Sequence, residues 1–166
     1  MKKLKLLVII SLISNFALAQ QEPKEVEEIR KIYNETKNLI PNRDKLSTNY
    51  SANQLIEGMQ VPVKTSYTAY FAKNRGFDNQ RIIFIEAKFK GGIDGVDSTT
   101  EYLFDKGDLI FVYRSANAEG ENITSRCYYK GQKVLHRRGE YATSEECNRL
   151  RKKGEELKKS ILIMQK

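Results

Sequence analysis

Hydrophobic residues recur at two different periods along this chain, and each period predicts a different kind of element. Between residues 23 and 40 they recur about every 3.6 positions, and Pro23 and the glutamates after it suit the first turn of a helix. A second helical stripe runs from Thr143 to about Met164, where Thr143 and Glu146 have the spacing of a capping box. The pattern predicts one core-covering amphipathic helix near each end of the chain.

From Ser66 onward the period changes to two. Runs that alternate or are densely apolar are separated by turn sequences such as Asp105-Lys106-Gly107 and Lys130-Gly131. Short spacers require antiparallel pairing, since a parallel crossover needs about a dozen residues or more. We predict a meander of about five or six strands, with one sheet face against the helices and the other partly exposed to water. Residues 42–66 fit either a loop or an additional pair of strands.

Alternation also assigns side chains to the two sheet faces. After Arg81 it places Ile83 and Ile85 on one face, and Ile82 and Phe84 on the other. The predicted fold class is α+β, with N-terminal and C-terminal helices packed on one antiparallel β-meander. The length of 166 residues suits a single domain.

The first residues, MKKLKLLVIISLISNFALA, have the three parts of a secretory signal peptide. Lysines open the segment, residues 6–13 form a short apolar core, and Ala17 and Ala19 are the small residues before a cleavage site. The apolar run is too short for a good spanning helix, the alternative being an uncleaved anchor. We predict a signal peptide over 1–19 and one domain over 20–166. The mature protein is then exported to the periplasm or outside the cell and does not span the membrane.

The two cysteines, Cys127 and Cys147, both lie in the part of the chain that is predicted to be exported. An even number of cysteines in an oxidising compartment indicates a disulfide, which would tie the second helix to the strand that carries Cys127. The alternative is two buried free thiols. We expect no metal and no cofactor, because His136 is the one histidine and no C-x-x-C spacing occurs.

Charge bears on the partners of the protein. The net charge of +8 falls to about +5 once the three lysines of the predicted signal peptide are removed. This excess favours weak attraction to anionic surfaces but is not the dense stripe typical of nucleic-acid binders, so no nucleic-acid partner is expected. Basic residues cluster at 133–138 and at 149–159. They fit a protein or an anionic polymer of the cell envelope, or else a solvated surface partly neutralised by glutamates.

Tyrosines in and beside the meander are candidates for a recognition surface, because tyrosine gives a large contact area at small entropic cost. Sheet propensity explains the same residues without any partner. We select Tyr113, Tyr128 and Tyr129 as candidate contact residues, with Arg137 and Arg138 at the rim.

Sequence motifs for catalysis are missing: the chain has no G-x-S-x-G, S-x-x-K, H-E-x-x-H or phosphate loop. Asp94 and Asp97 lie among the glycines of the stretch 91–97, and with Glu101 they are candidate calcium ligands, but their spacing is not that of an EF-hand. We interpret that stretch as a turn and leave enzymatic activity open, with a non-catalytic role favoured.

The segment YLFDKGDLIFVY at 102–113 contains the pattern Y-x-F-x-x-G-x-L-I, and a looser copy follows at 127–135. With the preceding GGIDGVDSTTE, this pattern resembles a group of uncharacterised small exported bacterial proteins that join an N-terminal helix to repeated hairpins. The hairpins are also similar to MORN repeats. The resemblance covers about residues 24–138. It implies the fold and assigns no activity to any residue.

The function favoured by these observations is a non-catalytic binding module of unknown ligand, acting in the cell envelope or outside the cell. One alternative is an enzyme acting on an envelope polymer, which requires convergent carboxylates in a cleft. The other is a structural envelope subunit that self-associates, for which an exposed edge strand or apolar patch would be the sign. The sequence leaves the oligomeric state open.

Overall fold

The structure is a computed structural model that describes residues 22–56, 59–72, 81–91, 97–118 and 120–164. The signal peptide predicted over 1–19 lies outside the described residues, as does the candidate ligand Asp94. In the described ranges, no helix combines the length and the apolar character needed to cross a membrane.

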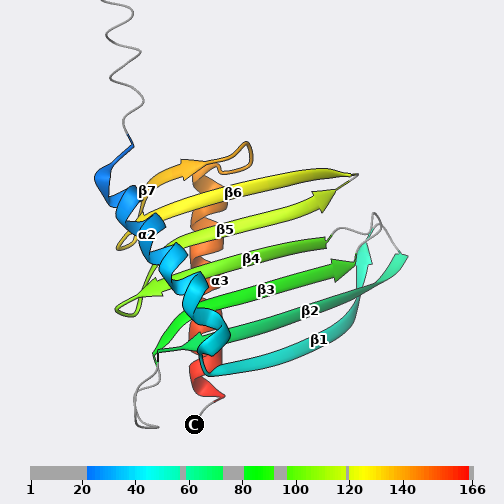
Figure 1. Ribbon diagram of the computed structural model, residues 1–166. Coiled ribbons are helices and arrows are strands. Elements are labelled where there is room, and N and C mark those ends of the chain that lie inside the picture. The colour runs from blue at the N-terminus through cyan, green and yellow to red at the C-terminus, as the bar shows by residue number, and fades with distance from the viewer. Residues whose placement is uncertain (1–21, 57–58, 73–80, 92–96, 119, 165–166) are drawn as a thin grey trace, which may run out of the picture.

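The described chain forms one antiparallel sheet and two long helices (Figure 1). The helices are α2 (Lys24–Leu39) and α3 (Ser144–Ile163), and a short 3-10 helix, η1 (Ile40–Asn42), follows α2. Each strand pairs with the next along the chain, so the sheet is a meander. In order, the strands are β1 (Lys45–Ile56), β2 (Met59–Phe71), β3 (Ile82–Gly91), β4 (Asp97–Asp105), β5 (Asp108–Ala118), β6 (Glu121–Lys130) and β7 (Lys133–Arg138).

The predicted α+β fold is confirmed, and the sheet is larger than predicted. Within the described residues it has seven strands, because 45–56 and 59–71 form the additional pair β1 and β2. Strand β1 is exposed along nearly all of its described length. Without a buried set of apolar residues, its sequence carries no alternation that would mark a strand.

The two helices lie on opposite faces of the sheet, with α2 in front and α3 behind in Figure 1. The prediction of a single helix-covered face was therefore wrong. Both alternating sets of side chains are large and apolar where the helices cross the strands, and two apolar faces need two covers. Phe84, Leu103, Phe111 and Tyr128 pack under α2, whereas Ile85, Tyr102, Val112 and Cys127 pack under α3.

A β-bulge changes the face assignment at the start of β3. Phe71 pairs with Ile82 and Tyr70 with Phe84, so Ile83 has no partner on β2. Ile82 consequently joins the core under α3, and Ile83 packs on the α2 side. Alternation alone groups Ile83 with Ile85, which is wrong, because a bulge shifts the alternation by one residue.

The beginning of α3 is fixed in two ways. Thr143 is the predicted N-cap, and its Oγ1 accepts a hydrogen bond from the Glu146 N–H at 3.1 Å. In the same turn, Cys147 forms the predicted disulfide with Cys127 of β6, with a Cα–Cα distance of 5.7 Å. This bond is typical of proteins from oxidising compartments.

Further along α3, Gly154 lies where the helix crosses Tyr102 of β4. A Cβ atom at this position would lie 2.6 Å from Cδ1 of Tyr102. The glycine, which weakens the helix by itself, is thus explained by the close approach of α3 to the ring.

Candidate functional site

Both helices cross the sheet near one end of its strands and leave the other end uncovered (Figure 1). Strands β2 to β6 have 9 to 13 residues and so span about 30–43 Å, whereas a helix with its side chains is about 10–12 Å wide. One helix on each face therefore covers only part of each strand. The sheet that projects beyond α3 is the candidate binding surface.

On the α3 side, the uncovered sheet and the helix enclose a groove of about 470 Å³, hereafter the α3 groove. Strand register explains its floor. Thr65, Phe89 and Ser98 form one cross-strand row, and Tyr67, Ala87 and Thr100 form the next. The floor therefore combines two aromatic side chains with several hydroxyl groups, a surface that can both stack and hydrogen-bond.

The wall of the α3 groove is basic. Arg149 and Lys153 of α3 line it together with Arg114 of β5. Glu146 accepts hydrogen bonds from Arg149 at 2.6 and 2.7 Å and from Arg114 at 2.7 Å. The hydrogen bonds from Arg149 and the nearby Arg114 hold the pKa of Glu146 below its usual range, and Glu146 raises the pKa of Arg149. One carboxylate thus neutralises part of this cluster, and the wall keeps an excess of positive charge.

A second hollow of about 460 Å³ adjoins the first at Arg114, which lines both. Ala116 and Ile123 contribute apolar floor, and Tyr141 stands at its edge with 52% of its surface exposed. The two hollows meet at Arg114, whose guanidinium group forms an ion pair with Glu146. The two hollows therefore lie side by side along one flank of α3.

The other flank of α3 carries a hollow of about 750 Å³. Its lining has five basic residues, with Arg149 of the α3 groove among them, and three acidic ones, Asp108, Glu155 and Glu156. These carboxylates offset more than half of the positive charge of this hollow, whereas the lining of the α3 groove contains no Asp or Glu. The α3 groove is smaller and chemically more selective.

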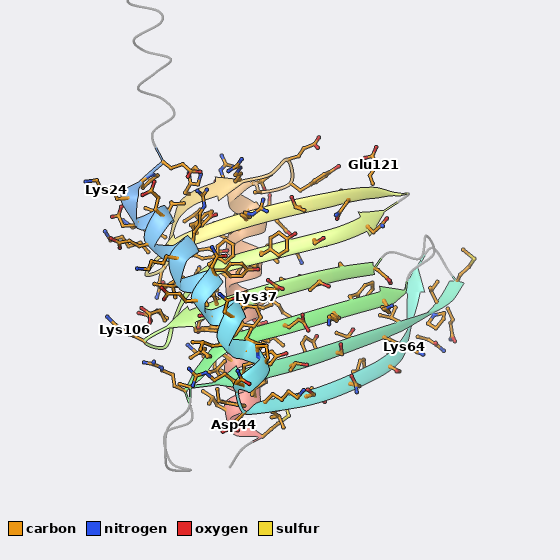
Figure 2. All side chains as sticks on the ribbon, in the orientation of Figure 1. Lys24, Lys37, Asp44, Lys64, Lys106 and Glu121 are labelled. Carbon is orange, nitrogen blue, oxygen red and sulfur yellow. A yellow bond between two sulfur atoms is a disulfide. The ribbon has the colours of Figure 1, made fainter. Side chains whose placement is uncertain are left out.

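Under α2, one buried carboxylate is fully engaged. Glu101 is 6% exposed, accepts a hydrogen bond from Lys37 Nζ at 2.7 Å, and accepts a second from the Tyr33 hydroxyl. Burial, and secondly the Glu101 carboxylate, raise the pKa of Tyr33 well above its usual range. Lys37, labelled in Figure 2, comes from α2, so this cluster fastens that helix to β4.

The three candidate calcium ligands do not meet in the described part of the chain. Glu101 is held by Lys37 and Tyr33, and Asp97 pairs with Lys90 at 3.4 Å. No cluster of three or more His, Cys, Asp or Glu residues suited to a metal ion occurs within the described ranges.

The predicted contact tyrosines are not brought together. Tyr128 is 1% exposed under α2, and its hydroxyl accepts a hydrogen bond from Arg30 at 3.1 Å. Tyr129, also 1% exposed, packs under α3 and donates its hydroxyl to the Cys147 carbonyl at 2.7 Å. Tyr113 is half-buried on the α2 side, with Arg126 above its ring at 5.2 Å. Two of the three are core residues on opposite faces.

The predicted rim arginines also point to different faces. Arg137 lies opposite Cys127 on the α3 side and donates to the Ala142 carbonyl at 3.2 Å. Arg138 pairs with Arg126, whose side chain lies on the α2 side. The two basic residues therefore do not form one rim.

Sequence reasoning missed Phe89, Arg114, Arg149 and Lys153 as members of one groove. The sequence feature that could have indicated this groove is the length of the strands. A strand of about ten residues is too long to be covered by one helix on each face. Tyr67 lies in β2 of the meander, but periodicity alone does not tell where along a strand a helix crosses.

Comparison with protein-family models, with curated proteins and with solved structures finds no match for this chain.

Proposed function

We propose that the protein is a non-catalytic binding module of an extracytoplasmic compartment, and that it holds an extended anionic polymer, an acidic polysaccharide, in the α3 groove. The observation that carries this proposal is the composition of the groove. Tyr67 and Phe89 offer faces on which sugar rings stack, the Ser and Thr hydroxyls suit sugar hydroxyls, and Arg149 and Lys153 suit carboxylates.

The shape supports a polymer rather than a small molecule. The second hollow adjoins the α3 groove at Arg114, so the two together offer an elongated and open binding surface. A pocket for a small molecule would instead enclose most of its ligand.

The carboxylates near the groove support binding rather than catalysis. Glu146 is committed to two arginines, and the buried Glu101 lies across the sheet under α2. His136 packs against Tyr128 with its ring tilted by 46°, on the face opposite the groove. The described lining therefore offers no pair of free carboxylates for acid–base chemistry.

Export is the second part of the proposal. It is supported by the Cys127–Cys147 disulfide and by the signal-like segment MKKLKLLVIISLISNFALA. We expect the exported protein to begin at Gln20, which intact-mass analysis of the protein recovered from outside the cytoplasm would establish. A mass that retains residues 1–19 would contradict cleavage after Ala19.

The binding proposal is tested by affinity electrophoresis in gels that contain polygalacturonate, with a neutral glucan gel for comparison. We expect retardation only in the acidic gel, and weaker retardation as salt is raised. The groove variant is Arg114→Ala with Lys153→Ala, because Arg149 lines the hollows on both flanks of α3. The control, Lys152→Ala with Lys159→Ala, removes the same charge from the other flank of α3.

Loss of retardation in the groove variant, with retention in the control, would support the α3 groove. Equal loss in both variants would mean that net charge alone attracts the polymer, and the groove would be abandoned. An unretarded native protein would refute acidic polysaccharide as the ligand class. A third variant, Phe89→Ala, keeps the charge and tests stacking directly; it should weaken binding about fivefold or more.

A further inference from the structure

The two edges of the sheet differ in how they are protected. Strand β7 has only six residues, three of them Lys or Arg, and a bulge interrupts its pairing with β6. These are the devices by which natural sheets prevent edge-to-edge association. Strand β1 at the other edge has twelve residues, KLSTNYSANQLI, with a single charge at Lys45, no proline and regular pairing throughout.

The hydrogen-bond pattern identifies the backbone groups of β1 that point outward. The Phe71 N–H donates to the Asp44 carbonyl at 3.0 Å, and these residues are opposite one another just before the β1–β2 ladder. In an antiparallel ladder, bonded and non-bonded pairs alternate. Residues 46, 48, 50 and 52 therefore bond to β2, whereas the N–H and C=O groups of 45, 47, 49, 51 and 53 face away from the sheet.

Exposed hydrophobic side chains gather around the same edge. Helix α2 ends where the chain enters β1. Helix α3 rises about 1.5 Å per residue and crosses strands about 4.8 Å apart. About 16 residues therefore carry it from Cys147, which is bonded to Cys127 of β6, to the level of β1, near Ile163. Figure 1 shows this end of α3 emerging at the β1 side of the sheet. Apart from Tyr141, the exposed large hydrophobics of the described ranges lie on β1, at its hairpin turn or at these helix ends: Leu39, Leu46, Tyr50, Met59, Leu162, Ile163 and Met164.

We infer that β1 is a self-association edge, at which two copies of this chain pair β1 to β1 in antiparallel fashion and join their sheets. A strand is the partner that satisfies a row of outward backbone groups, and the flanking apolar residues indicate a protein surface. A two-fold axis near Asn49 would pair Ser47 with Ser51 of the second copy and satisfy both outward rows at once.

Charge favours a second copy over an unrelated basic or acidic strand. The protein is basic overall, so most self-contacts are opposed by repulsion, but β1 carries only Lys45. Antiparallel pairing places the two Lys45 residues at opposite ends of the joined strands, about 26 Å apart at a rise of about 3.3 Å per residue. The two-fold axis also places one set of apolar helix ends, from each copy of the chain, on either side of the axis.

Sedimentation velocity and light scattering of the full chain, purified with its disulfide formed, test this inference. We expect a dimer whose fraction rises with protein concentration, with a Kd of about 100 µM or lower. In the variant Asn49→Pro, an outward N–H is lost while the bonds of β1 to β2 remain, so the dimer should weaken about tenfold or more. The matched variant Asn49→Thr keeps the N–H and should dimerise normally.

A second variant guards against misfolding of the proline variant. Ile163→Lys places a charge at the apolar end of α3, and its matched control Tyr141→Lys changes an exposed hydrophobic residue away from this edge. We expect the first to weaken dimerisation and the second to leave it unchanged. A protein that stays monomeric up to 100 µM, a dimer that survives both edge variants, or open-ended polymers in place of a dimer would each overturn the inference.

Discussion

Replacing Gly154 by alanine tests the packing of α3 on the sheet. Helix propensity predicts that the change stabilises the protein, whereas packing against Tyr102 predicts that it destabilises it. In an isolated helix the change is favourable by about 1 kcal/mol. In this protein the new Cβ would lie 2.6 and 3.0 Å from two ring atoms of Tyr102 and 3.2 Å from a methyl group of Leu109. Tyr102 is 3% exposed, so its ring has no open space into which to move.

Overpacking of a well-packed core costs about 1–3 kcal/mol, and contacts this short belong at the upper end of that range. After the gain in propensity is subtracted, Gly154→Ala should lower the free energy of unfolding by about 2 kcal/mol. Equilibrium unfolding in urea measures this as a midpoint about 1 M lower. In a Tyr102→Leu background, which removes the ring, the same change should become neutral or stabilising. A Gly154→Ala protein that is more stable than the native protein would refute the close approach of α3 to β4.

Three further changes probe other parts of the structure. Cys147→Ser opens a disulfide between residues 20 apart and should cost about 3 kcal/mol on the chain-entropy model, measured by urea unfolding against the oxidised protein. The pKa of Glu146 is lowered from its ordinary 4.5, chiefly by Arg149, so its stabilisation is full above about pH 4.5 and is lost as the pH falls through the folded value. The stability difference between native protein and Glu146→Gln should therefore shrink below pH 4.5; a difference that grows there would contradict the assignment. Glu101→Ala removes the acceptor of the Tyr33 hydroxyl and should destabilise the fold by about 2 kcal/mol, with earlier proteolysis of α2 as a local readout.

The helices, the antiparallel meander and the disulfide could be predicted from the sequence, because each depends on local signals. Helical periodicity, turn residues between short strands and an even number of cysteines are all read within about twenty residues. The cap at Thr143 formed as predicted, but Glu146 did not complete the capping box. Its carboxylate bonds to Arg114 and Arg149 instead, and Arg114 is 32 residues away in the chain.

The candidate site depends on information that local patterns do not contain. Tyr128 and Tyr129 are adjacent in sequence, and a strand sends adjacent side chains to opposite faces, so they could share a surface only if one of them were not in a strand. Whether Tyr67 or Tyr102 is covered depends on where α3 crosses the sheet. Gly154 permits that crossing, because a Cβ atom at this position would lie 2.6 Å from the Tyr102 ring. The reason for a glycine at this position is clear only from the structure, in which the Tyr102 ring lies beneath it.

The two proposals combine into one consequence for binding. A two-fold axis perpendicular to the sheet keeps each face on its own side, so dimerisation through β1 would place both α3 grooves on the same face of the joined sheet. A polymer long enough to span both grooves would then bind with avidity, whereas a short acidic oligosaccharide would bind each groove independently. The edge variant Asn49→Pro should therefore weaken binding of long polygalacturonate about tenfold or more and leave the affinity for a trisaccharide unchanged. Equal weakening for both ligands would show that the edge of the sheet and the groove are not independent, and the separate assignment of the two surfaces would fail.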